Sequence, residues 1–316
     1  MITSAQIPTG SPIRDFSVVH HAGQTLIVCA EKWGQVLTWA PATGEWMPRP
    51  LPYAHAEDPS MAKFPDAANV IDMVGALSAD GRLLLAAGGD EQEPALWDLD
   101  SGELLWRTPF NGAYLADVIA VDGAFVTAQQ YSEEVRLWSP DGTDTVLGQV
   151  SSPFCLAATR VDGRRLILAG GSEAEVWDAG TLAHLGYFAP EEGRVWAVTA
   201  CALAGRPVVV GGTEEGELYV WPLDAQPDGL PLYEPVAASD GPLEAAVMTP
   251  GGRPVVVTAD QGALRLWDAA DGTEAGRVGA HDVTAMEPAI VDGRQVLVTS
   301  GADGVLRIWD ESDLTP

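Results

Sequence analysis

The stretch VDGRQVLVTSGADGVLRIWD, residues 291–310, decides the fold of this chain. An Asp-Gly pair at 292–293 precedes a short apolar run, and a second Asp-Gly pair at 303–304 separates this run from the one that ends at Trp309-Asp310. Asp-Gly between two apolar runs is a strong short-range signal for a β-hairpin, because both residues accept positive φ angles. The stretch therefore predicts short antiparallel strands joined by tight turns.

The same pattern recurs along the whole chain. Seven tryptophans close short apolar runs at spacings of 58, 41, 39, 44, 46 and 42 residues, and each follows a hairpin glycine by 14 to 16 residues. The tryptophans are Trp39, Trp97, Trp138, Trp177, Trp221, Trp267 and Trp309. A period near forty residues with four short strands per unit is typical of a propeller blade. We therefore predict an all-β chain, a seven-bladed β-propeller of four-stranded antiparallel blades, as a single domain over residues 1–316.

Two places depart from the regular repeat. Few residues follow Trp309, so we expect residues 2–8 to supply the outer strand of the last blade and to remove an exposed sheet edge. Between Trp39 and Trp97 the chain carries a proline-rich, non-periodic insertion at 48–69, which we expect to form a long loop. Long loops on rigid scaffolds often carry recognition, so the insertion is one candidate for a binding role.

The repeats resemble those of the WD-repeat family, because the dipeptide Trp-Asp stands at 97–98, 177–178, 267–268 and 309–310. Val-Asp-Gly-Arg before an apolar strand is similar to what bacterial, actinobacterial-like members of this family carry. The resemblance implies ring closure by the N-terminal strand and a role in protein interaction. For the last repeat, it also implies a buried hydrogen-bonded tetrad of His281, Ser300, Asp303 and Trp309.

Composition restricts the possible partners and the location. The chain has 17 Lys and Arg against 45 Asp and Glu, a net charge of −28, which argues against a surface that follows nucleic-acid phosphates. The sequence has neither an apolar run long enough to span a membrane nor the features of a signal peptide, so we expect a cytoplasmic protein with no membrane partner. Cys29, Cys155 and Cys201 lie in apolar strands without metal-ligand spacing and are expected to be buried free thiols.

The sequence offers no catalytic constellation. None of the five histidines belongs to a metal-binding His-x-x-x-His pattern or lies beside a nucleophile elbow. Calcium loops and phosphate-binding loops are absent from the sequence as well. We therefore predict no catalytic residue, no cofactor and no metal ligand, and favour a protein that is not an enzyme.

Two sets of equivalent positions are candidates for binding a partner. The residues nine positions before the hairpin glycines include Arg14, Asp72, Tyr114, Phe154 and Trp196, three of them aromatic. The turns before the tryptophan strands are acidic in four consecutive repeats, and the family places these turns on the same face as the loops that lead into the inner strands. The acidic candidates are Glu91, Glu134, Glu173 and Glu215. Aromatic rings beside carboxylates can hold a cationic group, although such rings can equally be core between blades.

The function predicted from these residues is a non-catalytic binding platform or scaffold for a protein or peptide partner with basic character. A different class stays open, namely an enzyme or an amine-binding or cation-binding protein whose pocket lies at the mouth of the central channel, under the 48–69 insertion and near His55. A passive structural subunit of a larger assembly is a third possibility. Neither the oligomeric state nor the identity of a partner follows from the sequence.

Overall fold

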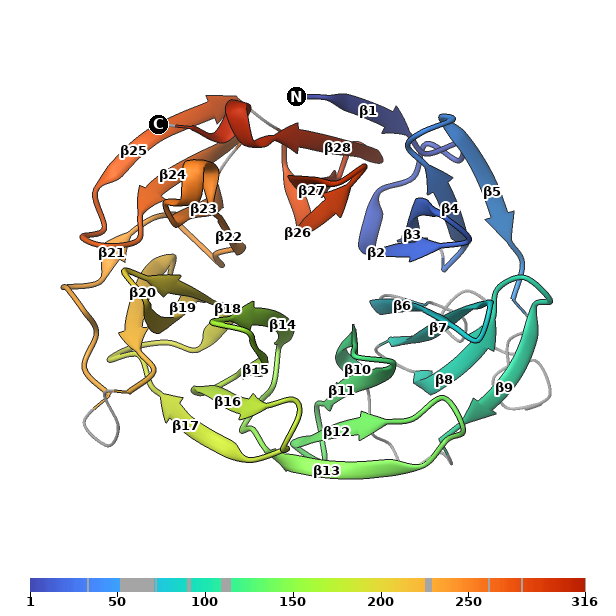
Figure 1. Ribbon diagram of the computed structural model, residues 1–316, viewed down its shortest axis with the longest axis horizontal. Coiled ribbons are helices and arrows are strands. Elements are labelled where there is room, and N and C mark those ends of the chain that lie inside the picture. Colours follow the sequence, from blue (N-terminus) through green and yellow to red (C-terminus); the bar gives the residue numbers. More distant parts are fainter. Residues whose placement is uncertain are drawn as a thin grey trace. The chain divides into compact units, whose positions relative to one another are not determined.

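The structure is a computed structural model that describes residues 1–32, 34–51, 71, 73–89, 92–108, 115–224, 229–260, 262–279 and 281–315. Among these residues the strands β1 to β28 form seven four-stranded antiparallel sheets, as Figure 1 shows. The fold is a seven-bladed β-propeller, which confirms the predicted fold class. Residues 48 and 49 of the predicted insertion belong to a strand, and most of the insertion lies outside the described residues.

Contacts divide the chain into two compact units. We call them the N-terminal unit, Ala5–Val146 with Ser300–Leu306, and the C-terminal unit, Met1–Ser4, Leu147–Thr299 and Arg307–Pro316. That the whole chain forms one domain stays a prediction. No helix in the described ranges is long and apolar enough to cross a membrane.

The first three blades each consist of four strands that are consecutive in sequence. In the N-terminal unit, Figure 1 shows β2, β6 and β10 on one side and β5 and β9 on the opposite side. The strands are β2 (Ile13–His21), β3 (Gln24–Glu31), β4 (Val36–Ala40), β5 (Glu45–Arg49), β6 (Met73–Ala79), β7 (Arg82–Gly89), β8 (Gln92–Asp98), β9 (Glu103–Arg107), β10 (Leu115–Val121), β11 (Ala124–Gln129), β12 (Glu134–Trp138) and β13 (Asp144–Gln149), of which residues 147–149 belong to the C-terminal unit.

The C-terminal unit repeats this arrangement. Its strands are β14 (Cys155–Val161), β15 (Arg164–Gly170), β16 (Ala174–Asp178), β17 (His184–Phe188), β18 (Val195–Leu203), β19 (Arg206–Thr213), β20 (Glu217–Pro222), β21 (Val236–Ala237), β22 (Ala245–Met248), β23 (Val255–Asp260), β24 (Ala263–Asp268), β25 (Glu274–Gly279), β26 (Val283–Val291) and β27 (Arg294–Gly301). Buried Val, Leu and Trp side chains of adjacent blades form its core clusters. Burial of this apolar surface is the main force that holds the blades together.

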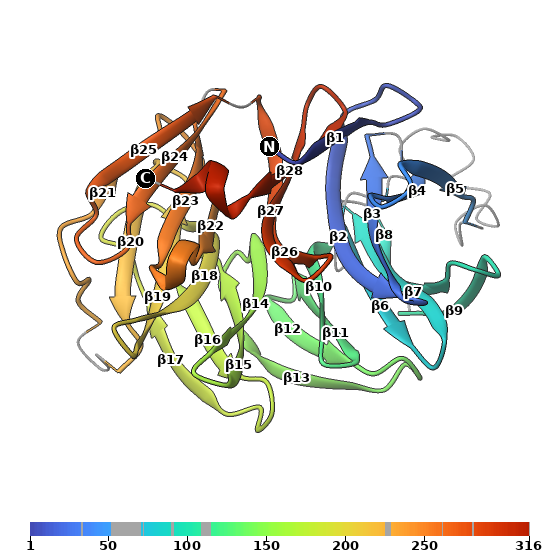
Figure 2. The same ribbon diagram turned by 45° about the horizontal axis from the view of Figure 1, so that its top comes forward.

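The N-terminal strand completes the last blade, as the sequence predicts. The order of that sheet is β1 (Thr3–Gln6), β28 (Val305–Asp310), β27 and β26, and Figure 2 shows β1 beside β28. The backbone N–H of Ile2 donates to the carbonyl of Ile308, and that of Ile7 donates to Gly304, both at 2.8 Å. A side chain at Gly304 would collide with the carbonyl of Ser11, so this close approach requires glycine.

The hairpin turns have the geometry that the Asp-Gly pairs predict. Asp80, Asp122, Asp162 and Asp292 have φ angles of 51°, 44°, 49° and 50°, and the glycine after each also has positive φ. Two successive positive φ angles define the type I′ turn, whose twist matches that of paired strands. The turn chemistry thus fixes where the first and second strands of these blades meet.

The repeated tryptophans are core residues, and three of them form the same type of hydrogen bond to a threonine. The indole N–H of Trp138 donates to Thr127 at 2.9 Å, that of Trp267 to Thr258 at 2.8 Å, and that of Trp309 to Thr299 at 3.0 Å. Each threonine lies two residues after the strand partner of its tryptophan. The hydroxyl therefore satisfies a donor that would otherwise be buried and unpaired.

The tetrad implied for the last blade stays a prediction. The indole N–H of Trp309 donates to Thr299, whereas the tetrad implied by the resemblance includes the next residue, Ser300. Ser300 is fully buried, His281 is half-buried and Asp303 is exposed, with its carboxylate accepting from the backbone N–H of Val305 at 3.1 Å. The position of Thr299 follows from strand alternation, because residues two apart point to the same face.

The aspartate of each Trp-Asp dipeptide caps the turn that follows. Carboxylates of Asp98, Asp178, Asp268 and Asp310 each accept a hydrogen bond from the backbone N–H two residues later, at 3.0 Å. This is the Asx-turn geometry that favours aspartate before a tight turn. The dipeptide therefore combines a core anchor with a turn cap, and this explains why it recurs at the end of the third strand.

Candidate functional site

Two of the predicted aromatic residues lie against each other in the C-terminal unit. Phe154 immediately precedes β14 and Trp196 lies in β18, and their rings stack with centroids 5.0 Å apart at an interplanar angle of 26°. Both side chains are half-buried, so they are neither fully exposed nor fully part of the core. The sequence correctly placed them at equivalent positions of neighbouring blades. Tyr114, the third aromatic candidate, lies outside the described residues.

Backbone hydrogen bonds bring these two positions together. Phe154 N–H donates to the carbonyl of Gly170 at 2.8 Å, and Val195 N–H donates to that of Gly171 at 2.7 Å. A Cβ atom at Gly170 would lie 2.8 Å from the oxygen of Val195, and one at Gly171 would lie 2.9 Å from the oxygen of Ser152. Close approach of the backbone therefore requires glycine both at the end of β15 and at the next position, which explains the Gly-Gly pair in this repeat.

A cation of the chain itself lies on the aromatic pair. The guanidinium carbon of Arg194 is 4.5 Å from the centroid of the Phe154 ring. Its Nε and Nη2 atoms donate to the carboxylate of Glu214 at 3.0 and 2.7 Å. Hydrogen bonding to Glu214 raises the pKa of Arg194, and hydrogen bonding to Arg194 lowers the pKa of Glu214. Arg194 therefore already occupies the position where the sequence predicts a cation from a partner. Nothing in the sequence indicated this internal cation.

Further acidic residues lie in the segments that carry Arg194 and Glu214 and in the turn after β15. Glu173 is half-buried, and Glu191, Glu192 and Glu215 are exposed. The segment that carries them is anchored, because Glu191 N–H donates to the Tyr219 hydroxyl at 3.3 Å. We call this surface the aromatic–acidic edge. It consists of Phe154, Glu173, Glu191, Glu192, Arg194, Trp196, Glu214 and Glu215.

The remaining predicted site residues do not lie in the C-terminal unit. Arg14 is exposed on β2. Glu134 begins β12 and accepts hydrogen bonds from Arg136 Nε at 2.9 Å and Nη2 at 2.7 Å, so a residue of its own strand occupies its carboxylate. Asp72, Glu91 and His55 lie outside the described residues. Their role in binding stays a prediction.

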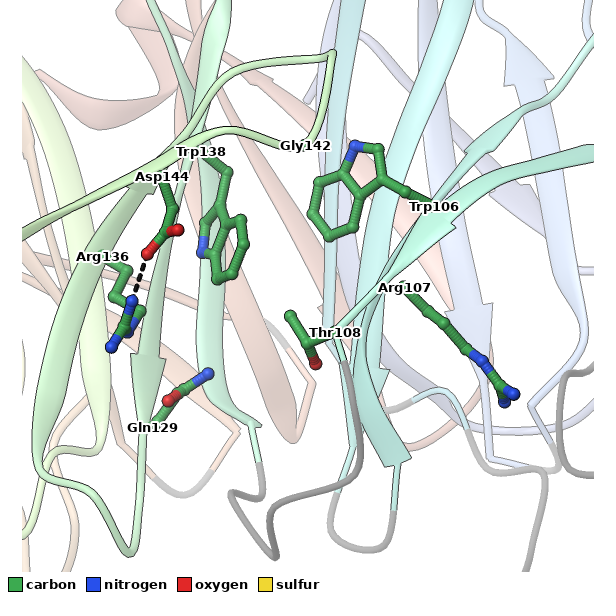
Figure 3. A pocket seen from close by; sticks show the side chains of 8 residues that line it. All are labelled: Trp106, Arg107, Thr108, Gln129, Arg136, Trp138, Gly142 and Asp144. Atoms are coloured by element: carbon green, nitrogen blue, oxygen red, sulfur yellow. Dashed lines mark hydrogen bonds and ion pairs between the residues drawn. The ribbon is translucent and has the colours of Figure 1, made fainter.

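A cleft opens in the N-terminal unit between β9 and β12–β13. Its volume is about 380 Å³, and Figure 3 shows the residues that line it. They are Trp106, Arg107, Thr108, Gln129, Arg136, Trp138, Gly142 and Asp144. No residue of β2, β6 or β10 is among these lining residues, so the cleft is not the pocket predicted at the mouth of the central channel. That pocket stays a prediction, because most of the insertion that would cover it lies outside the described residues.

Metal and thiol chemistry have few candidates within the part of the chain that the structure describes. No group of three or more His, Cys, Asp or Glu side chains there could hold a metal ion. All three cysteines are free, Cys29 and Cys201 buried and Cys155 half-buried. Burial raises the pKa of Cys201 to about 12, so its thiol stays protonated and a poor nucleophile at neutral pH.

No protein-family model matches the chain, and no curated protein matches it. The function therefore has to be inferred from the residues of this chain and their geometry.

Proposed function

We propose that this propeller is a non-catalytic binding platform whose partner is a protein or peptide with positively charged side chains. β-Propellers commonly serve as protein-interaction scaffolds. The observation that carries the proposal is the half-buried stack of Phe154 on Trp196 at 5.0 Å, with Arg194 over the Phe154 ring and bonded to Glu214. Partly exposed aromatic anchors with a charged rim are the usual composition of an interface hot spot.

Charge favours a basic partner. Glu191, Glu192 and Glu215 have exposed side chains with no ion-pair partner among the described residues. The net charge of −28 extends the attraction beyond this edge and accelerates the encounter with a positively charged segment. A guanidinium fits the site, because Arg194 occupies the face of Phe154. An exposed cation–π contact of this kind is worth about 0.5–1 kcal/mol.

The proposal extends to the family of the protein and to its location in the cell. We infer that the chain is a degenerate bacterial WD-repeat protein that acts in the cytoplasm, with no nucleic-acid or membrane partner. Four Trp-Asp dipeptides, each with a turn-capping aspartate, support this relationship.

The test is a direct binding measurement on the whole chain. An array of peptides rich in Arg and Lys, each paired with a version in which Gln replaces the basic residues, is probed with the wild type and with a Phe154→Ala, Trp196→Ala double variant. We expect the wild type to bind basic peptides and not the Gln versions, and the folded double variant to bind neither. Equal binding by both proteins would place the site elsewhere, and binding of the Gln versions would contradict a basic partner.

A further inference from the structure

The cleft of the N-terminal unit has an apolar wall of two tryptophans. The rings of Trp106 and Trp138 stack with centroids 5.2 Å apart at 26°. Trp106 donates its indole N–H to the carbonyl of Pro140 at 3.2 Å, and Trp138 donates to Thr127 at 2.9 Å. Since both indole N–H groups are already bonded, these rings offer only carbon surface to a ligand.

Two further side chains of the cleft carry unused hydrogen-bonding capacity. Thr108 is 7% exposed, and its buried hydroxyl has no partner among the residues that the structure describes. Gln129 is 2% exposed, and its Oε1 accepts from the Ser132 hydroxyl at 2.9 Å, which leaves the amide NH2 as its donor. Buried polar groups are nearly always hydrogen-bonded in folded proteins. An unpaired one beside a cleft therefore indicates a position where a ligand can supply the partner.

The charges around the cleft cancel. Arg136 donates from Nε and Nη2 to Glu134, at 2.9 and 2.7 Å, and from Nη1 to Asp144. Arg107, Arg136 and Asp144 line the cleft, and Glu134, which pairs with Arg136, supplies a second negative charge beside it, in a chain whose net charge is −28. An amine would find both carboxylates engaged by Arg136, and an anion would meet those same carboxylates. The electrostatics therefore favour a neutral ligand, to which Arg136 can still offer two of its five N–H groups.

We propose that this cleft binds a neutral carbohydrate as one or two sugar rings. A sugar ring combines apolar C–H faces, which match the tryptophan wall, with hydroxyls that both donate and accept. Those hydroxyls can bond Thr108, Gln129 and Arg136 without bringing a charge into the cleft. The volume of about 380 Å³ lies at the small end of the range for ligand sites. A purely apolar ligand would leave the polar groups unpaired.

The experiment is a titration of the whole chain with neutral mono- and disaccharides of glucose, galactose, mannose and N-acetylglucosamine, followed by saturation-transfer NMR. We expect at least one of them to bind at millimolar concentration, with little dependence on salt because it is uncharged. Thr108→Val removes the hydroxyl and keeps the shape of the side chain. It should weaken binding by roughly tenfold while the melting temperature stays equal or rises, because the hydroxyl has no partner to lose among the residues that the structure describes.

A second variant and a matched control complete the test. Trp106→Ala should abolish binding, whereas Trp46→Ala, which removes another half-buried tryptophan of the same unit that stacks on Trp39 at 5.9 Å, should leave sugar affinity unchanged. Failure of every sugar to bind the wild type would overturn the proposal. So would sugar binding that survives Thr108→Val undiminished, or a preference for an arginine or phosphate probe over the sugars.

Discussion

The guanidinium carbon of Arg194 lies 4.5 Å from the centre of the Phe154 ring, while its Nε and Nη2 atoms donate to the carboxylate of Glu214. The chain thus fills its own cation site with a surface ion pair. Such exposed pairs contribute about 0–1 kcal/mol to stability, so a partner can displace the arginine at low cost.

We therefore expect Arg194→Ala to strengthen binding of a basic peptide several-fold, because the substitution uncovers Phe154 and frees Glu214. Fluorescence anisotropy with a labelled Arg-rich peptide measures this. Arg206→Ala is the matched control, since Arg206 forms a similar surface pair with Asp224 at 2.7 Å away from the aromatic pair. Weaker binding by Arg194→Ala would instead mean that Arg194 contacts the partner directly.

Trp196→Ala should abolish peptide binding and leave cooperative folding intact, because the ring is half-buried and its stacking partner is a surface aromatic. Calorimetric titration gives the affinity, and a thermal melt reports folding. Tyr187→Ala, which removes another aromatic of the same unit that is 50% exposed on β17, should keep wild-type affinity. Strong destabilisation of Trp196→Ala with unchanged affinity would identify the ring as core.

Thr299→Val should destabilise the protein by about 1–3 kcal/mol, because it leaves the indole N–H of Trp309 buried without its acceptor. Urea unfolding measures the change. Replacement of the neighbouring Ser300 by Ala serves as the comparison for the same strand. A loss no larger for Thr299→Val than for Ser300→Ala would contradict the assignment of the acceptor.

Adding a hydroxyl acceptor beside a tryptophan that has none is expected to stabilise the first blade. The indole N–H of Trp39 is buried without a partner among the described residues, and Cys29, two residues after the strand partner Ile27, lies where three other blades carry threonine. Cys29→Ser should supply the acceptor and raise the free energy of unfolding by about 1 kcal/mol. Cys201→Ser, the same substitution in an apolar cluster, should lower it instead. Similar losses in both variants would refute the pairing.

We predict that the stability of the folded protein falls at acid pH as Asp178 becomes protonated. Hydrogen bonds from the backbone of Thr181, and then from the side chain of Arg164, lower the pKa of Asp178 to about 2. Because the pKa is lower in the folded state, its stabilising contribution is present above the ordinary value near pH 4 and disappears as the pH falls toward 2. Urea midpoints of the wild type and Asp178→Asn should therefore differ at neutral pH and converge in acid. A difference that stays constant would contradict the assignment.

The sequence was enough to select Phe154 and Trp196 as candidates, but it indicated neither Arg194 nor the cleft. Equivalent repeat positions selected Phe154 and Trp196, whose rings stack, and the acidic turns selected Glu173 and Glu215, whose role in binding stays a prediction. No periodic signal marked Arg194, because its neighbours are Phe154 and Glu214, which lie far from it in sequence. The cleft likewise depends on Trp106 and Trp138 meeting from different sheets.

The sequence by itself determined the repeat, the hairpins and the identity of the core tryptophans. These features are local, since Asp-Gly accepts positive φ and alternation assigns each strand residue to a face. Only the tertiary structure decided which side chains meet: Arg194 on Phe154, Trp106 on Trp138, and Thr299 as the acceptor for Trp309. The physical reason is that these contacts depend on strand register and on the packing of neighbouring sheets, which no short stretch of sequence encodes.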